Sequence, residues 1–188
     1  MVNKLTILYV LEPFLFQPKE ELHLSYLSKY FNEPHPTLRL KLNYLEEKGI
    51  LKKTYKGRLT LYKINFNLPN IIDIITISEK IKLIKLSQEN LIFREFINFL
   101  QTKFEEKNSI VIFGSFVENY KKANDIDILI IGKYNNKNIE DFIKKYNLNL
   151  HIINLKKLSE ISNSLKIEII KKHLLIKNSE SLIRWLYW

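Results

Sequence analysis

The 188-residue chain has no cysteine, and only four glycines, five prolines and one methionine. Without cysteine it can form neither disulfide bonds nor cysteine-ligated zinc sites, and a chain indifferent to redox conditions is expected in the cytoplasm. No apolar run approaches the roughly 20 residues that a membrane-spanning helix needs, and no N-terminal signal is visible. We therefore expect a cytoplasmic protein without a membrane partner.

Acidic residues are in the minority, because 30 lysines and arginines accompany 20 aspartates and glutamates, for a formal net charge of +10. Residues 1–66 hold 11 basic and 6 acidic residues (11 − 6 = +5), and the longer remainder, 67–188, holds 19 and 14 (19 − 14 = +5). Positive charge is therefore denser in the N-terminal third, where it would attract a polyanion such as double-stranded DNA. The same charge would also serve solubility alone, and composition does not choose between the two.

The most informative pattern links two apolar runs in the C-terminal half. Residues 110–113 end on Gly114-Ser115, and after nine intervening residues Asp125 and Asp127 open the run that ends at residue 131. Residues two apart on a strand share a face, so the two carboxylates should project together while the isoleucine between them enters a core. Paired carboxylates suit a hard cation such as Mg²⁺, and a small turn lets backbone amides approach a phosphate. The pattern predicts nucleotide chemistry, although an ordinary βαβ turn with acidic strand caps would share it.

This order of strand, Gly-Ser turn, spacer and Asp-x-Asp strand resembles the nucleotidyltransferase superfamily that includes DNA polymerase beta. Within it, the similarity is greatest to the minimal nucleotidyltransferases of prokaryotes. The resemblance implies Mg²⁺-dependent transfer of a nucleoside monophosphate, with AMP from ATP as the expected group, to a protein or RNA acceptor. Some minimal relatives are antitoxins that modify a partner toxin. In this chain, Asp125 and Asp127 would be the catalytic metal ligands, and Gly114 and Ser115 would bind the nucleotide.

Two departures from the family pattern bear on activity. The family's third carboxylate is expected on the strand predicted over residues 148–155, where the candidate positions hold His151 or Asn149. With two carboxylates, a second cation would be held poorly. His151 could act instead as a general base, or could be an ordinary strand histidine satisfied by a neighbour. The Arg-Gly that relatives often carry after the turn is also missing, and Lys121 and Lys122 are the candidates to replace its charge.

The N-terminal third resembles a winged helix-turn-helix. Hydrophobic spacing and turn residues predict helices over residues 5–11 and 20–31, a third helix from Pro36 to Gly49, and a hairpin of strands 50–55 and 58–64. In such folds the third helix enters the DNA major groove and the hairpin contacts phosphates.

The expected DNA contacts are Thr37, Arg39, Asn43, Lys52, Lys53, Lys56 and Arg58. The third helix also presents Leu40 and Tyr44, which favours a protein contact such as a homodimer or docking onto the second domain. DNA binding and a structural or protein-binding role therefore both stay open for this module.

The predicted fold class is α+β: an N-terminal winged helix-turn-helix followed by a small mixed-sheet nucleotidyltransferase domain packed with helices. The expected boundaries are 1–66 for the first domain, 67–95 for a linker and connecting helix, and 96–188 for the second. Residues 71–77 have no clear assignment, and 78–106 read as one bent helix or two. An alternative function is a DNA-binding transcriptional regulator whose degenerate second domain senses a nucleotide, which the missing third carboxylate favours.

Overall fold

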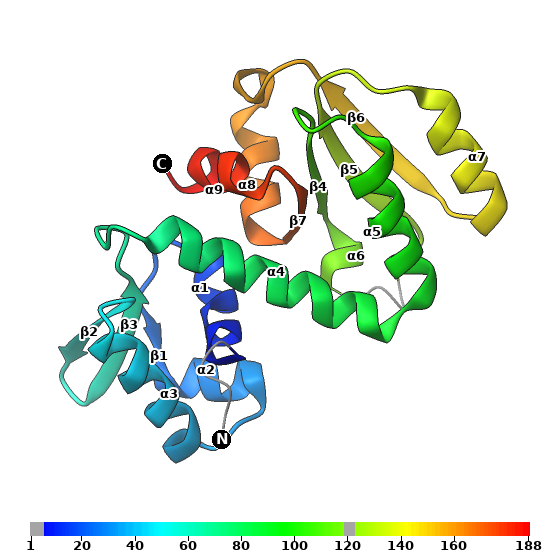
Figure 1. Ribbon diagram of the computed structural model, residues 1–188. Helices are drawn as coiled ribbons and strands as arrows, with labels where there is room; N and C mark the ends of the chain where they lie inside the picture. Colours follow the sequence, from blue (N-terminus) through cyan, green and yellow to red (C-terminus); the bar gives the residue numbers. More distant parts are fainter. Residues whose placement is uncertain (1–5, 119–122) are drawn as a thin grey trace. The chain divides into compact units, whose positions relative to one another are not determined.

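The computed structural model describes residues 6–118 and 123–188 (Figure 1). The chain divides into two compact units, Met1–Ile81 and Lys82–Trp188, and the division falls inside helix α4 (Ile71–Glu89). Within the described ranges each unit contains its own sheet together with helices. The expected α+β class is therefore confirmed.

The N-terminal unit combines short helices with a small antiparallel sheet in the order β1-β3-β2. Its elements before α4 are the 3₁₀ helix η1 (Thr6–Leu11), α1 (Glu12–Phe16), β1 (Leu22–His23), α2 (Leu24–Phe31), α3 (His35–Glu47), β2 (Leu51–Lys56) and β3 (Leu59–Ile64).

Two predicted boundaries in this unit were wrong. The first helical segment continues past Pro13 because this proline occupies the first turn of α1, where its missing N–H is not needed. The second helix begins at Leu24 rather than near residue 20, since residues 22–23 pair with β3 as β1. The Nδ1 atom of His23 accepts a hydrogen bond of 3.1 Å from the N–H of Tyr26 and so caps α2.

The third helix and the hairpin are confirmed. The leucine stripe of α3, at positions 38, 42 and 45, is fully buried, as its spacing requires. Gly49 follows α3 with a φ of +71°, and Gly57 turns the hairpin with a φ of +59°. The strands β2 and β3 pair from Leu51 with Ile64 to Lys56 with Leu59, which leaves a two-residue turn.

The region expected to contain a linker and one or two helices forms two helices, α4 and the first helix of the C-terminal unit. Residues 71–77, which the sequence left open, form the start of α4. A second helix, α5 (Leu91–Lys103), begins after Asn90, whose Oδ1 atom accepts a 3.0 Å hydrogen bond from the N–H of Phe93. This cap separates α5 from α4, so residues 78–106 contain two helices rather than one bent helix.

The C-terminal unit is built on a mixed four-stranded sheet in the order β6-β5-β4-β7, in which β5 and β6 are parallel and the other pairs are antiparallel. Its strands are β4 (Ser109–Phe113), β5 (Ile126–Ile131), β6 (Leu150–Leu155) and β7 (His173–Lys177). The helices after α5 are α6 (Ser115–Glu118), α7 (Asn136–Tyr146), η2 (Leu158–Glu160), α8 (Asn163–Lys171) and α9 (Ser179–Tyr187).

Strand alternation gives the two faces of this sheet different partners. Ile112 and Ile128 lie opposite each other on one face, in a core shared with Phe96 of α5 and Ile139 of α7. Figure 1 shows α8 and α9 on the other side of the sheet. Asp127 is the strand neighbour of Ile128, and neighbouring residues of a strand point to opposite faces of the sheet. Asp127 therefore projects on the side of α8 and α9.

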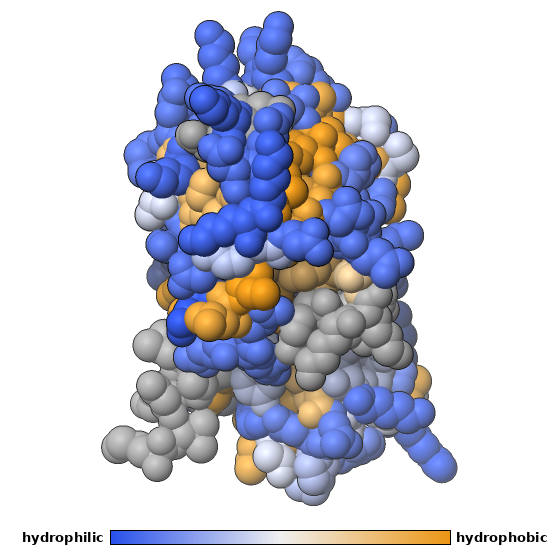
Figure 2. Space-filling model, turned by 90° about the vertical axis from the view of Figure 1, so that its right-hand side faces the viewer, coloured by the Kyte–Doolittle hydropathy of each residue, from blue (hydrophilic) through white to orange (hydrophobic). Residues whose placement is uncertain are grey.

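The face seen in Figure 2 is largely hydrophilic, with separate hydrophobic patches. Large exposed apolar side chains include Leu40 on α3 and Leu91 on α5, at 73% and 62% exposure. Tyr44, which was expected beside Leu40, is partly buried. Among the described residues, no helix has both the length and the apolar character needed to span a bilayer.

Candidate functional site

Asp127 lies against the Gly-Ser turn, as the sequence pattern predicts. The register places Asp127 of β5 opposite Phe113, the last residue of β4, so that Gly114 follows immediately beside it. Gly114 has a φ of +77°, and a Cβ atom added there would lie 2.4 Å from the Oδ2 atom of Asp127. Only glycine allows the turn and this carboxylate to approach so closely.

Asp125 lies in the bend that leads into β5. Asp125 and Asp127 are both partly exposed, whereas Ile126 and Ile128 are buried at 6% and 0% exposure. This alternation is what the sequence predicts for two carboxylates that stay near solvent while their neighbours enter the core. The arrangement leaves acidic oxygen atoms available at the start of β5.

His151 lies beside Asp127 at the position where the family's third carboxylate was expected. The two residues are register partners on β5 and β6, and the Nδ1 atom of His151 is 3.0 Å from the Oδ1 atom of Asp127. The His151 side chain is 65% exposed. The other candidate position, Asn149, instead donates to the carbonyl of Asn124 at 3.5 Å.

This contact assigns the histidine tautomer. An ionised carboxylate only accepts hydrogen bonds, so Nδ1 of His151 must carry the hydrogen. In the neutral ring Nε2 is then the acceptor, and no partner for it occurs among the described residues. An exposed imidazole held by Asp127 can therefore accept a proton at Nε2.

Of the other residues predicted to bind the nucleotide, Ser115 lies within the described part of the chain. Ser115 begins α6 and is exposed, while the next residue, Phe116, is buried and packs against Phe93 at a ring-centroid distance of 4.9 Å. Phe116 therefore anchors the turn that presents Ser115. Lys121 and Lys122 lie outside the described residues.

The donor set fits one hard divalent cation better than two. Asp125 and Asp127 offer carboxylate oxygens of the kind that Mg²⁺ prefers, and the missing side chain of Gly114 lets the carboxylate of Asp127 lie directly against the turn. However, His151 occupies one oxygen of Asp127, and the described residues contain no group of three or more His, Cys, Asp or Glu able to hold a metal ion. A second cation would therefore need ligands from a substrate.

The residues expected to contact DNA lie on α3 and on both faces of the β2–β3 hairpin. Lys53 is directed toward α3, where its Nζ donates to the Oδ1 atom of Asn43 at 3.1 Å and lies 3.8 Å from Glu46. Asn43 also accepts from the hydroxyl of Tyr62 at 3.4 Å. Lys53 and Asn43, both predicted to contact DNA, thus form hydrogen bonds within the protein.

The opposite face of the hairpin carries Lys52 and Lys56, which alternate with Lys53 along β2. Lys56 forms a 2.9 Å ion pair with Glu21, and its ammonium group lowers the pKa of that carboxyl. Lys52, Arg58 and Arg39 are exposed and have no acidic partner in the described part of the chain. Thr37 is exposed near the start of α3.

The carboxylate of Asp127 against a glycine turn, with Asp125 two residues before it, makes this end of the mixed sheet a candidate phosphate- and metal-binding site. Residues 93–185 match the family model described as a nucleotidyltransferase domain. This match supports the assignment of this region to the nucleotidyltransferase family and to transferases at a coarse level.

The other comparisons add no functional argument. No curated protein matches the chain. A solved structure described as "Structure of TrmBL2, an archaeal chromatin protein, shows a novel mode of DNA binding" is 16% identical over 84% of this chain and 70% of that chain. Its TM-score is 0.25, too low to support either a fold or a function.

Proposed function

We propose that the protein is a Mg²⁺-dependent nucleotidyltransferase that transfers AMP from ATP to a hydroxyl group of a protein or RNA acceptor. The observation that carries this proposal is the contact geometry of Gly114 with Asp127, where the turn leaves no room for a Cβ atom. The family match over residues 93–185 supports the same class of reaction. A partner toxin is one protein acceptor that the proposal includes.

In this reaction the acceptor oxygen forms a bond to the α-phosphorus while the bond between the α-phosphorus and the bridging oxygen breaks, and pyrophosphate leaves. Asp125 and Asp127 would hold the cation, and Gly114 and Ser115 would hold the β- and γ-phosphates. A bound divalent cation supplies charge neutralisation to the triphosphate. The protein itself contributes mainly positioning. Lys121 and Lys122 are proposed to add positive charge near the phosphates.

His151 is proposed to accept the proton of the attacking hydroxyl. Asp127 holds Nδ1 at 3.0 Å, which leaves Nε2 as the basic atom of the exposed ring. A general base must reach the proton that it removes, directly or through one water molecule. In this proposal the Asp127–His151 contact would hold a proton acceptor beside the cation ligand Asp127.

The test is transfer of label from α-labelled ATP, with Mg²⁺, to cell-lysate proteins and RNA. We expect label transfer by the wild type and its loss in Asp125→Ala/Asp127→Ala. Asp141→Ala is the matched control, because Asp141 is an exposed aspartate on α7 of the same unit. Equal labelling by the wild type and the double variant would contradict the proposal.

A second candidate function is a nucleotide sensor without transferase activity. It is favoured by one observation, the histidine at the position of the family's third carboxylate. Calorimetry with ATP and Mg²⁺ separates the two functions, since a sensor binds ATP but releases no pyrophosphate. Binding that is lost in Asp127→Ala, without any turnover by the wild type, would favour the sensor.

We further propose that the N-terminal unit binds double-stranded DNA as a winged helix-turn-helix. The order of α2, α3 and the β2–β3 hairpin supports this module, as does the exposure of Lys52, Arg58 and Arg39. Lys56→Ala/Arg58→Ala should weaken binding to duplex DNA and reduce its salt dependence. Retention of the double variant on DNA at low salt, equal to that of wild type, would contradict DNA binding.

The two single substitutions are expected to weaken DNA binding to different extents. Arg58→Ala should have the larger effect, because Glu21 already partly neutralises Lys56.

Exposed Leu40 supports a homodimer as a separate proposal, which sedimentation of wild type and Leu40→Glu would test. A single monomeric species for both proteins would contradict the homodimer.

A further inference from the structure

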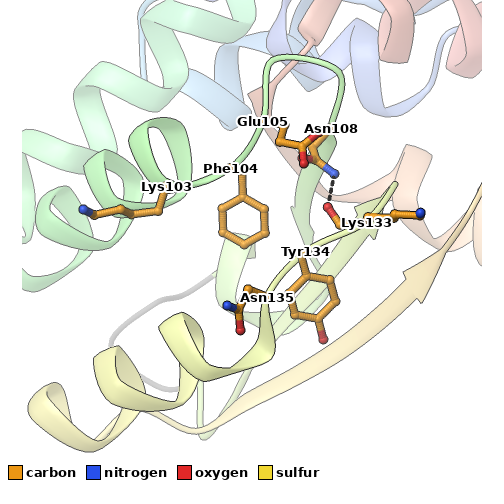
Figure 3. A pocket seen from close by; sticks show the side chains of 7 residues that line it. All are labelled: Lys103, Phe104, Glu105, Asn108, Lys133, Tyr134 and Asn135. Atoms are coloured by element: carbon orange, nitrogen blue, oxygen red, sulfur yellow. Dashed lines mark hydrogen bonds between the residues drawn. The ribbon is translucent and has the colours of Figure 1, made fainter.

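A pocket of about 310 Å³ lies at the end of the β4–β5 pair opposite to Asp127 (Figure 3). It is lined by Phe104 and Asn108, which precede β4, and by Lys133 and Tyr134, which follow β5. Asp127 and Ile131 are four residues apart on β5, so the two ends of the strand pair lie about 13 Å apart. A molecule bound here could not place a reacting atom at Asp127, and the pocket is therefore separate from the candidate active site.

The walls of the pocket are fixed by buried polar contacts. Asn108 is fully buried, and its Nδ2 atom donates to the carbonyls of Ile131 at 3.2 Å and Lys133 at 2.9 Å. Figure 3 shows the second of these bonds joining the two loops that form the pocket. On the other side, the ammonium of Lys177 donates to the carbonyls of Gln101 and Phe104 at 2.7 and 2.9 Å, which holds the end of α5. A preformed cavity of this kind binds ligands without a large ordering cost.

The chemical character of the pocket is aromatic and cationic. The rings of Phe104 and Tyr134 are inclined by only 26° with centroids 6.0 Å apart, so they form a nearly parallel pair. A flat ring can extend such a pair by offset stacking. Lys103 and Lys133 lie on opposite sides of the rings in Figure 3, and both ammonium groups point outward there. The one acidic lining residue, Glu105, is paired with Lys107 at 2.7 Å. Because both lysines are exposed and have flexible four-carbon stems, their ammonium groups can turn toward an anion at the rim.

We propose that this pocket binds a small, flat aromatic anion: a ring that stacks on Phe104 and Tyr134 and carries a carboxylate or phosphate group within reach of Lys103 or Lys133. The volume lies at the lower end of the range for ligand sites, which favours one fused ring system rather than a larger molecule. The inference does not depend on nucleotidyl transfer, because none of its residues belongs to the candidate active site.

The test compares three probes by calorimetry with the full-length protein. Indole-3-carboxylate has both the ring and the charge, indole-3-carboxamide lacks the charge, and cyclohexanecarboxylate lacks the aromatic ring. We expect the first to bind with a dissociation constant on the order of 1 mM. The carboxamide should bind about threefold more weakly, and cyclohexanecarboxylate about fivefold more weakly. Equal affinities for the three probes, or no binding of the first, would overturn the proposal.

Variants locate the site. Tyr134→Leu should weaken indole-3-carboxylate binding about fivefold and Lys133→Gln about threefold. Lys171→Gln should leave it unchanged, because Lys171 is an exposed lysine on α8 that does not line the pocket. Asp127→Asn should also bind the probe normally, whether or not nucleotide transfer fails. Loss of probe binding in Asp127→Asn with retention in Tyr134→Leu would place the ligand at the active site and contradict the inference.

Discussion

At each end of the β4–β5 pair, a glycine with positive φ lies against a polar side chain, but the two side chains differ in their exposure to solvent. At one end Gly114 (φ +77°) lies against the carboxylate of Asp127, and at the other Gly132 (φ +107°) lies against the carboxamide of Asn108. The Asp127 side chain is 21% exposed, whereas Asn108 is 0% exposed. At Gly114 the close approach leaves a carboxylate partly open to solvent. At Gly132 it allows a buried carboxamide to hydrogen-bond to the carbonyls of Ile131 and Lys133.

This contrast predicts the largest functional effect for Gly114→Ala. A Cβ atom 2.4 Å from the Oδ2 atom of Asp127 forces the carboxylate to move. Because the side chain is partly exposed, it can move without unfolding the domain, but a displacement of about 1 Å can cost about 100-fold in rate. Transfer of labelled AMP should fall by about that factor, with a melting temperature near that of Gly57→Ala.

Gly57→Ala is the matched control, since Gly57 also has positive φ and no atom within 4 Å of an added Cβ. Its cost therefore reports the backbone conformation alone. If Gly114→Ala retained wild-type transfer, the contact between the turn and Asp127 would not matter for activity.

At the other end, Gly132→Ala should affect stability first. The added Cβ would lie 2.6 Å from the Nδ2 atom of Asn108, which cannot swing away because it is buried and donates to two carbonyls. Backbone strain together with broken buried hydrogen bonds should lower the free energy of unfolding by about 3 kcal/mol. Urea denaturation followed by circular dichroism measures this loss. A loss no larger than that of Gly57→Ala would show that the two loops are not fastened by this contact.

The smallest expected effect concerns the partner of Asp127. His151→Asp would place a third carboxylate beside the pair, at the register position opposite Asp127. We expect affinity for Mg²⁺ to rise about tenfold. The substitution adds a carboxylate oxygen of the kind that Mg²⁺ prefers, and it removes the His151 contact with Asp127, a change at a ligand's partner that typically alters metal affinity by this amount or more. Calorimetric titration with Mg²⁺ and non-hydrolysable ATP provides the measurement. His151→Asn is the control for loss of the imidazole alone, and equal affinities for the two variants would refute a metal role for this position.

Local patterns accounted for several features in advance. The leucine spacing of α3 required one buried face, and residues 38, 42 and 45 provide it. The Asp-x-Asp alternation placed isoleucines in the core and carboxylates near solvent. By contrast, all residues of 71–77 except Asp73 are β-branched but form the start of α4, because helix packing outweighs local propensity.

The sequence by itself determined that a Gly-Ser turn and two alternating aspartates would occur at strand ends, because these depend on chain neighbours and the period of two. Only the tertiary structure decided that Asp127 contacts His151, that Lys53 and Lys56 are occupied by Asn43 and Glu21, and that Phe104 meets Tyr134. The reason is that each of these contacts joins residues 10 or more positions apart. Such pairings follow from strand order and register, which no local pattern in the chain specifies.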